Sequence, residues 1–167
     1  MTVAPIAIPS WLSAFILLAA AHVAPWAAAR VLGPRWAAPL DAGATLRDGR
    51  RLFGDHKTWR GVLASGLLCA LLSPALGHSV WLGGTFAALA MSADLASSFL
   101  KRRLKLAPGR EVPGLDQIPE ALLPLLVLAP ALQIRPLTAT VLSALFLLLD
   151  LAAIPLRHHR KNTRRSR

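Results

Sequence analysis

The sequence predicts an all-α, polytopic membrane protein with about five transmembrane helices. Of its 167 residues, 54% are hydrophobic and 16% are charged, and the mean hydropathy is +0.50; soluble domains have about 45–50% apolar and 25% charged residues. Nineteen Lys and Arg and eight Asp and Glu are clustered, which leaves long stretches without charge. This pattern excludes a soluble globular domain, a disordered chain and a disulfide framework.

Apolar stretches long enough to cross a bilayer recur along the chain. A hydrocarbon core of about 30 Å needs roughly 20 helical residues, and about 17 to 25 are tolerated. Prolines such as Pro74, Pro124 and Pro130 predict kinks or irregular ends in the second and fourth stretches. Because residues 1–10 contain no Lys or Arg, we interpret the first stretch as a span rather than a signal peptide. The expected spans are residues 9–29, 61–77, 79–100, 118–134 and 137–156.

Basic residues predict the orientation of these spans. Seven Lys and Arg lie in residues 30–60, five in residues 101–110 and six in residues 157–167, which leaves Arg135 alone on the other side. With five spans the three clusters fall on one face, and the positive-inside rule makes this face cytoplasmic. The N-terminus is then expected outside and the C-terminus inside.

These assignments predict one membrane domain over residues 1–156, with cytoplasmic loops at residues 30–60 and 101–117. Residues 157–167 form a basic cytoplasmic tail, most simply an anchor to anionic lipid headgroups. We expect a cytoplasmic (inner) membrane protein whose active site faces the cytoplasm. No nucleic-acid partner is expected, and the sequence predicts no particular oligomeric state.

The first cytoplasmic loop combines glycines, bases and acids. Residues 40–61 read LDAGATLRDGRRLFGDHKTWRG. Glycines such as Gly54 let backbone amides approach a ligand, and Lys57, Thr58 and Arg60 offer donors to phosphate oxygens. A basic loop beside the membrane can instead contact anionic headgroups and fix the topology. The glycines and the interleaved acids favour a phosphate site, since a headgroup patch needs neither.

Asp94 lies inside an otherwise apolar helix, where a charge is costly unless it faces a polar cavity or a partner. Ser97, Ser98 and Lys101 follow it at three, four and seven positions, so the four side chains share one helix face. They are expected to line a site at the cytoplasmic membrane surface. The alternative is a structural ion pair between Asp94 and a neighbouring arginine.

Other polar residues begin or interrupt the later spans. Asp116 is expected either to cap the fourth helix or to act with Asp94 as a carboxylate ligand of a divalent cation, because Mg²⁺ usually takes one or two protein carboxylates. Asp150 is expected mainly to pair with a cytoplasmic Arg or Lys, and His22 to be packed or to face a pore. No His/Cys pair has zinc spacing, and the sequence contains neither a GxSxG elbow nor a Walker-type loop.

Two motifs resemble the signatures of a known family. The string DGRRLFGDHKTWRG, residues 48–61, resembles the signature loop of CDP-archaeol synthases, which are integral-membrane cytidylyltransferases. Residues 94–117, with SSFLKRR and LDQ, look like that family's second signature, and in outline they are similar to the S-x-x-K-R…D pattern of bacterial CDP-diacylglycerol synthases. Both motifs fall in order on the predicted cytoplasmic side.

The resemblance implies an activity and a set of site residues. The activity is transfer of a cytidylyl group from CTP to a lipid phosphate, either phosphatidic acid or a diether isoprenoid glycerol phosphate, with release of pyrophosphate and with Mg²⁺ as cofactor. By this resemblance Asp94, Lys101 and Asp116 are catalytic, and the two aspartates hold the metal. The implied substrate or phosphate contacts are Gly54, Lys57, Thr58, Arg60, Ser98 and Arg102.

One position departs from the family pattern. Three residues after the Asp of LDQ, where the family commonly has another acid, this chain has Pro119 followed by Glu120. Either Glu120 takes that place with a shifted geometry, or metal ligation is weaker or absent. The alternative function is a non-catalytic scaffold or transport subunit that binds anionic headgroups. A CDP-alcohol phosphotransferase is less favoured, because the DG at residues 48–49 is followed by two arginines rather than by Ala-Arg.

Overall fold

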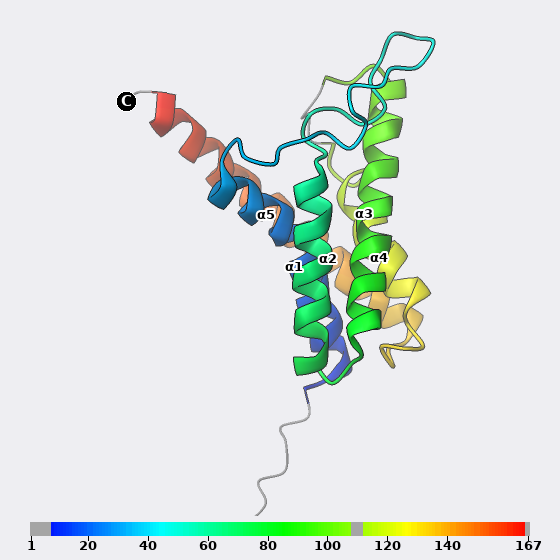
Figure 1. Ribbon diagram of the computed structural model, residues 1–167. Helices are drawn as coiled ribbons and strands as arrows, with labels where there is room; N and C mark the ends of the chain where they lie inside the picture. Colours follow the sequence, from blue (N-terminus) through cyan, green and yellow to red (C-terminus); the bar gives the residue numbers. More distant parts are fainter. Residues whose placement is uncertain (1–7, 108–111, 166–167) are drawn as a thin grey trace, which may run out of the picture.

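The protein is described by a computed structural model that covers residues 8–107 and 112–165, with side chains up to residue 153. These residues form five α-helices, which confirms the predicted all-α class. The loop at residues 33–58 and the described residues 104–107 and 112–116 lie at one end of the bundle, and the connections α2–α3 and α4–α5 lie at the other end (Figure 1). The helices are α1 (Ser10–Leu32), α2 (Trp59–Ala75), α3 (Val80–Arg103), α4 (Gln117–Val127) and α5 (Pro136–Arg165).

Three described helices are long and apolar enough to cross a membrane: α1, α3 and residues Pro136–Ala153 of α5. Helix α2 has 17 residues and α4 has 11, which correspond to lengths of about 25 and 16 Å. Both helices are therefore shorter than a hydrocarbon core of about 30 Å, and α4 is shorter by the larger amount. Five crossings and the cytoplasmic orientation of the loops remain predictions.

Three helix boundaries differ from the expected spans. Helix α4 ends at Val127 instead of reaching residue 134, and turns follow up to residue 133, around Pro130. Helix α3 continues to Arg103, so Lys101 and Arg102 lie in its last turn rather than in a loop. Helix α5 continues to Arg165, through the expected tail, whose side chains are outside the description. Lys and Arg are good helix formers, so a helix need not end where its apolar stretch ends.

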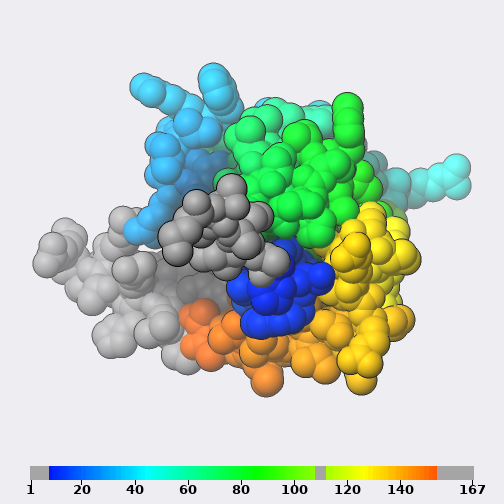
Figure 2. Space-filling model, turned by 90° about the horizontal axis from the view of Figure 1, so that it is seen from below, coloured from blue at the N-terminus to red at the C-terminus, as the bar shows by residue number. Residues whose placement is uncertain are grey.

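Helix α1 is central in the bundle. Seen from the end opposite the loops, the first turns of α1 lie between α2 and α3 on one side and α4 and α5 on the other (Figure 2). Ser65, Cys69 and Ser73 form a fully buried row on α2. At Gly83 of α3 an added Cβ would lie 2.2 Å from the Cys69 carbonyl oxygen. Small side chains therefore bring the backbones of α2 and α3 together.

Pro25 sets the path of α1 near the loops. It lies inside α1, where proline removes a helical hydrogen bond and kinks a helix. A Cβ added at Gly61, in the first turn of α2, would lie 3.2 Å from the Pro25 Cβ, so the two helices are in close contact here. Towards its C-terminal end α1 leans away from α2 (Figure 1), and this divergence leaves room for a cavity.

Candidate active site

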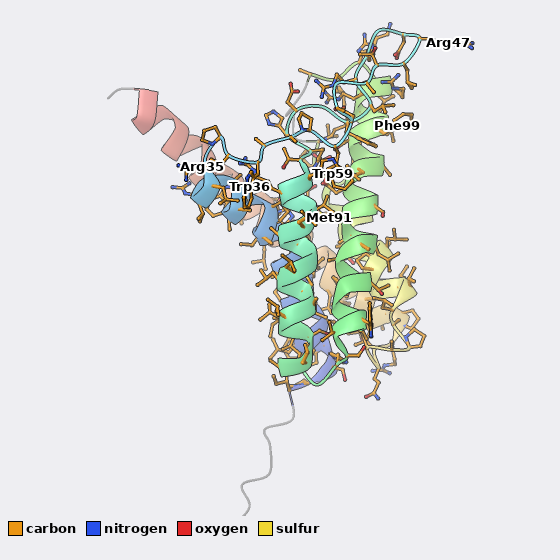
Figure 3. The ribbon with its side chains drawn as sticks, viewed as in Figure 1. Arg35, Trp36, Arg47, Trp59, Met91 and Phe99 are labelled. Carbon is orange, nitrogen blue, oxygen red and sulfur yellow. The ribbon has the colours of Figure 1, made fainter. Side chains whose placement is uncertain are left out.

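A cavity of about 200 Å³ lies at the loop end of the bundle, between α1, α2 and α3. Its apolar side includes Pro25, Ala29, Met91 and Leu95. Figure 3 shows Met91 and Trp59 where α2 and α3 lie side by side near the loop end. Pockets that enclose a whole small molecule measure about 300–1,000 Å³, so the cavity has room for part of a nucleotide. Its polar lining is formed by Asp55, His56, Lys57, Thr58, Arg60 and Asp94.

An ion pair lies in this lining. Lys57, which precedes α2, places its Nζ atom 2.5 Å from Oδ2 of Asp94 on α3. The structure therefore joins Asp94 to a lysine of the first loop rather than to a neighbouring arginine. Both side chains keep about a fifth to a quarter of their surface exposed, 26% for Lys57 and 20% for Asp94. A ligand entering the cavity can thus reach both charges.

Thr58 lies beside this pair, directly before α2. Its side chain makes no capping hydrogen bond to the helix, although threonine often caps a helix in this way. Thr58 lines the cavity, so its hydroxyl group is placed to bind a ligand there. The N-terminus of α2 carries the positive end of its helix dipole, and such ends favour phosphate groups.

The first loop is folded around the carboxylate of Asp41, whose side chain is fully buried. Asp41 pairs with Arg51 and accepts hydrogen bonds from the backbone amides of Gly43, Phe53 and Gly54. The Arg51 guanidinium, with the backbone amides, holds the pKa of Asp41 well below its usual range. The loop therefore has a fixed internal structure. Asp41, one of the acids interleaved with the basic residues, has a structural role in it.

Arg103 connects this loop to the end of α3. Its Nη1 atom donates to both carboxylate oxygens of Asp48 at 2.7 Å, and its Nη2 atom donates to the carbonyl oxygens of Arg50 and Arg51. Its guanidinium group also lies over the ring of Phe99, 5.2 Å from the ring centroid. The loop is thus held against the same helix that carries Asp94. By contrast, Arg47 lies at the outer tip of the loop and points away from the bundle (Figure 3).

Two residues expected to contact phosphate, Arg60 and Gly54, make hydrogen bonds to other groups of the protein. Arg60 lines the cavity, and its Nη1 atom donates to the carbonyl oxygens of Gly33 at 2.5 Å and Arg35 at 2.7 Å. Arg60 therefore attaches the segment after α1 to the start of α2. Gly54 adopts a φ of 108°, which glycine tolerates best, and its amide donates to Asp41. This amide supports the loop from within.

The remaining expected site residues lie towards the end of α3, outside the lining of the cavity. Lys101 pairs with Asp116 at 2.7 Å. Asp116 occupies the position before α4 without capping that helix, and its Oδ2 atom accepts a bond from the Val112 amide. Ser98 is buried, and so is Arg102, which donates from Nη2 to the carbonyl oxygen of Ala107. The structure thus brings Lys57 to Asp94 and Lys101 to Asp116 as two separate pairs.

The donor set suits a hard cation that arrives with phosphate groups. Among the described residues no three His, Cys, Asp or Glu side chains are grouped to hold a metal ion. Mg²⁺ usually binds through one or two carboxylates together with substrate phosphates and water. Asp94 offers one partly exposed carboxylate in the cavity. The residues therefore fit Mg²⁺ bound jointly with a substrate, rather than a closed protein site.

Sequence reasoning did not foresee a polar cluster below the cavity. Glu120 of α4 is buried and lies 3.1 Å from Nδ1 of His22 on α1, and Asp150 of α5 lies 3.6 Å from Nε2 of the same ring. Asp150 also accepts a hydrogen bond from Gln117 at 2.7 Å. A signal was present in the sequence, because each of these residues interrupts or adjoins an apolar stretch, but the pattern does not show which of them meet.

Comparison with known proteins agrees with this arrangement. A family model described as CarS-like, CDP-archaeol synthase, matches residues 8–157. The chain belongs to this family. The match runs from the start of α1 beyond the part of α5 that can cross a membrane, so it includes the cavity and both ion pairs.

Curated members of the CarS-like family are similar over part of their length. The CDP-archaeol synthase of Pyrococcus furiosus is 44% identical over 89 residues, which cover 47% of this chain and 53% of the relative. That of Aeropyrum pernix is 42% identical over 123 residues, 69% of this chain and 70% of the relative. The chain spans about half the length of the first relatives it matches.

A solved structure carries the same fold. It was described as an intramembrane enzyme for archaeal membrane lipids biosynthesis, and it is 39% identical with a TM-score of 0.67. The alignment covers 85% of this chain and 92% of that one. The present chain is thus an integral membrane protein of the CarS-like family.

Proposed function

We propose that this protein is a CTP-dependent cytidylyltransferase that acts on a lipid phosphate. The observation that carries the proposal is the Lys57–Asp94 pair in a cavity between membrane helices, beside the N-terminus of α2. A cation, a carboxylate and a helix N-terminus together suit a polyphosphate. Family membership supports nucleotidyl transfer, since the curated relatives are named CDP-archaeol synthases.

In the proposed reaction, a phosphate oxygen of the lipid attacks the α-phosphorus of CTP. A new P–O bond joins the lipid phosphate to the cytidylyl group, the bond between the α-phosphorus and its bridging oxygen to the β-phosphate breaks, and pyrophosphate leaves. No covalent enzyme intermediate is required, because holding the two phosphates in line and neutralising their charge lowers the barrier.

Three residues of the cavity lining act directly in this scheme. Lys57 turns from Asp94 towards the CTP phosphates and neutralises them, while the Thr58 hydroxyl and the first turn of α2 contribute hydrogen bonds and the helix dipole. Asp94 then faces the cation that accompanies CTP. Mg²⁺, when bound there, neutralises phosphate oxygens and the developing charge on the leaving pyrophosphate.

The Lys101–Asp116 pair is proposed to act on the same substrates from the end of α3. Helical geometry puts Lys101 about 10 Å from Asp94 along the axis, a distance that a triphosphate or two adjacent phosphates can bridge. We assign Lys101 and Arg102 to phosphate oxygens, Ser98 to the wall of the site and Asp116 to the second carboxylate position. Arg60 and Gly54 contribute by shaping the lining from within.

The lipid acceptor is proposed to be a diether isoprenoid glycerol phosphate, on the strength of the names of the relatives. Phosphatidic acid is the competing acceptor, because it carries the same phosphate on a glycerol backbone. The apolar side of the cavity, with Pro25, Ala29 and Met91, is suited to the first carbons of either lipid.

Transfer of labelled CMP from CTP into an organic extract tests the proposal. Purified protein in detergent receives CTP labelled on the α-phosphate, Mg²⁺ and one of the two acceptors, and a parallel reaction contains EDTA. We expect label in the lipid with the diether acceptor and none with EDTA. Label found only in the reaction with phosphatidic acid would identify phosphatidic acid, rather than the diether lipid, as the acceptor. Absence of label with both, in folded protein that shows no thermal stabilisation by CTP and Mg²⁺, would favour a headgroup-binding scaffold.

A further inference from the structure

Gln117 is the first residue of α4 and follows Asp116 directly, but it has no part in the scheme above. Its side chain is buried, and both ends of its amide form hydrogen bonds. Its Oε1 atom accepts from the backbone amide of Gly114 at 3.0 Å, and its Nε2 atom donates to Oδ2 of Asp150 on α5 at 2.7 Å. Gln117 therefore connects the segment before α4 to a helix that is distant in sequence.

The segment before α4 is a turn that carries Asp116. Gly114 adopts a φ of 84° within this turn, a value that glycine tolerates best. The backbone amide of Val112 donates to Oδ2 of Asp116 at 3.1 Å, and the Asp116 amide donates back to the Val112 carbonyl oxygen at 3.3 Å. Oδ1 of Asp116 is 2.7 Å from the Nζ atom of Lys101. The direction in which Asp116 points therefore depends on where the turn is held.

The turn is attached to α3 through the Lys101–Asp116 pair and to α5 through the Gln117–Asp150 hydrogen bond. These attachments differ in their relation to the proposed substrates. Lys101 is assigned to phosphate oxygens, so its bond to Asp116 has to open when the substrates bind. The Gln117–Asp150 bond contains no group assigned to substrate, and the Asp150 side chain is only 10% exposed. This bond can therefore remain closed throughout turnover.

We propose that Gln117, anchored by Asp150, is a positioning residue for Asp116. When Lys101 exchanges Asp116 for a phosphate oxygen, the Gln117–Asp150 bond keeps the turn in place, and Asp116 stays beside the substrates as the second carboxylate. Positioning of this kind matters because a misplacement of about 1 Å can cost roughly 100-fold in rate. The inference rests on the proposed function, in which Asp116 takes the second carboxylate position.

The contact requires an amide between its two partners. The backbone amide of Gly114 only donates and a carboxylate only accepts, so the side chain between them must accept at one end and donate at the other. In Gln117→Glu two carboxylates face each other across the contact. When Asp150→Asn is added, the amide and the carboxylate exchange places. The same hydrogen bond can then form in the reverse direction, and the total charge equals that of the wild type.

The test combines the kinetics of labelled CMP transfer with the melting temperature in the same detergent. We expect Gln117→Met and Gln117→Glu to lower kcat about tenfold or more, and to raise the Mg²⁺ concentration for half-maximal rate by a similar factor, as is typical when the partner that orients a metal-binding carboxylate is lost. The KM for CTP should change less, since Lys57 and Asp94 are untouched. Asp150→Asn should keep a nearly normal kcat, because its amide oxygen can still accept from Gln117.

The combined variant, Gln117→Glu with Asp150→Asn, is expected to recover a kcat within about threefold of the wild type, because the hydrogen bond is restored. Leu142→Ala is the control for stability. Leu142 is a buried core residue of α5, about two turns before Asp150. Its truncation should lower the melting temperature and leave kcat and the Mg²⁺ dependence unchanged at an assay temperature well below unfolding.

Three outcomes would overturn the inference and leave the proposed function intact. The first is an unchanged kcat and Mg²⁺ dependence in folded Gln117→Met, which is also the decisive variant if Gln117→Glu does not fold. The second is a combined variant with no recovery of kcat. The third is a kcat loss in Leu142→Ala equal to that of Gln117→Met, which would assign the effect to stability. Absence of transfer by the wild-type protein would overturn the proposed function and this inference together.

Discussion

The loop end and the opposite half of this bundle are held together by different interactions. At the loop end, charges connect segments distant in sequence: Arg51 to Asp41, Arg103 to Asp48, and Lys57 to Asp94. In the other half, the helices approach through small residues, where Gly83 meets the row that includes Cys69. Apolar side chains gain little free energy by moving from lipid into a protein interior. Membrane helices therefore associate through close packing of small residues.

From this difference we expect the proposed activity and the stability of the fold to depend on different parts of the chain. Lys57 and Asp94 are placed where water and ligand can reach them, and we expect a change in either to alter chemistry more than fold. Close backbone packing has no tolerance for added volume. Substitutions in the two regions should therefore separate turnover from stability.

Asp94→Asn is expected to have the largest effect on activity. The amide keeps the shape of the carboxylate but loses the charge that faces Lys57 and the cation, so we expect kcat to fall by about 10²–10³-fold, as for loss of one preorganised electrostatic group. Labelled CMP transfer measures this, with Ser92→Ala on the exposed face of α3 as control. Retained turnover would remove Asp94 from the site.

Gly83→Ala tests the half of the bundle in which close helix packing is expected to determine stability. The new Cβ would meet the Cys69 carbonyl oxygen at 2.2 Å and the Ser73 Cβ at 2.7 Å, so α2 and α3 must separate. We expect destabilisation of about 1–3 kcal/mol or more, as for other overpacked sites, seen as a lower melting temperature in detergent. Gly84→Ala is the matched control, because no atom lies within 4 Å of its added Cβ. Equal melting temperatures for the two variants would contradict the packing argument.

Asp41→Asn tests whether the first loop depends on its buried carboxylate. The variant leaves Arg51 with its exposed partner Asp55 and weakens the bonds from Phe53 and Gly54. Loss of a buried acceptor of this kind costs about 1–3 kcal/mol, so we expect cleavage of the loop by protease to accelerate about tenfold or more. Asp55→Asn should change it little, since this carboxylate is 75% exposed. A loop equally resistant in both variants would show that its structure has another origin.

The smallest expected effect is that of mild acid on the same loop. Because the Arg51 guanidinium lowers the pKa of Asp41 in the folded protein, the stabilisation is complete above the usual carboxyl pKa of about 4 and is lost progressively as pH falls below it. Protease resistance of the loop should therefore be constant from about pH 8 to 5 and decrease only below about pH 4. A decrease between pH 7 and 5 would point to a different titrating group.

Sequence alone predicted the parts of this protein that depend on composition and motif order. The apolar stretches gave the helices, and the two motifs gave the family and residues such as Lys57 and Asp94, which the structure brings together. Prolines in the fourth stretch predicted an irregular end, but the expected boundary at residue 134 was wrong, because hydropathy does not show at which residue the helix stops and α4 ends at Val127. Asp116 was not identified as the partner of Lys101, since pairing across a loop depends on three-dimensional geometry.

Polar residues within spans were the least predictable. His22, Glu120 and Asp150 lie on three different helices, and their spacing along the chain carries no information on how these helices rotate against one another. Asp150 was expected to pair with a cytoplasmic base, and this stays a prediction, because the side chains of the basic residues beyond 153 lie outside the described part of the chain. The contacts described for Asp150 include Gln117 and His22. Which of these side chains meet depends on how the helices pack in three dimensions.

The bond between Lys57 and Asp94 has a consequence for inhibitor chemistry. A cavity that already contains its own cation and its own anion presents little net field to a simple anion, which must separate the two before it gains a contact. A zwitterion, such as an aminophosphonate on a short apolar chain, would give each member of the pair a new partner at once. Competitive inhibitors of this protein should therefore be selected among molecules that carry both charges a few ångströms apart, rather than among phosphate mimics alone.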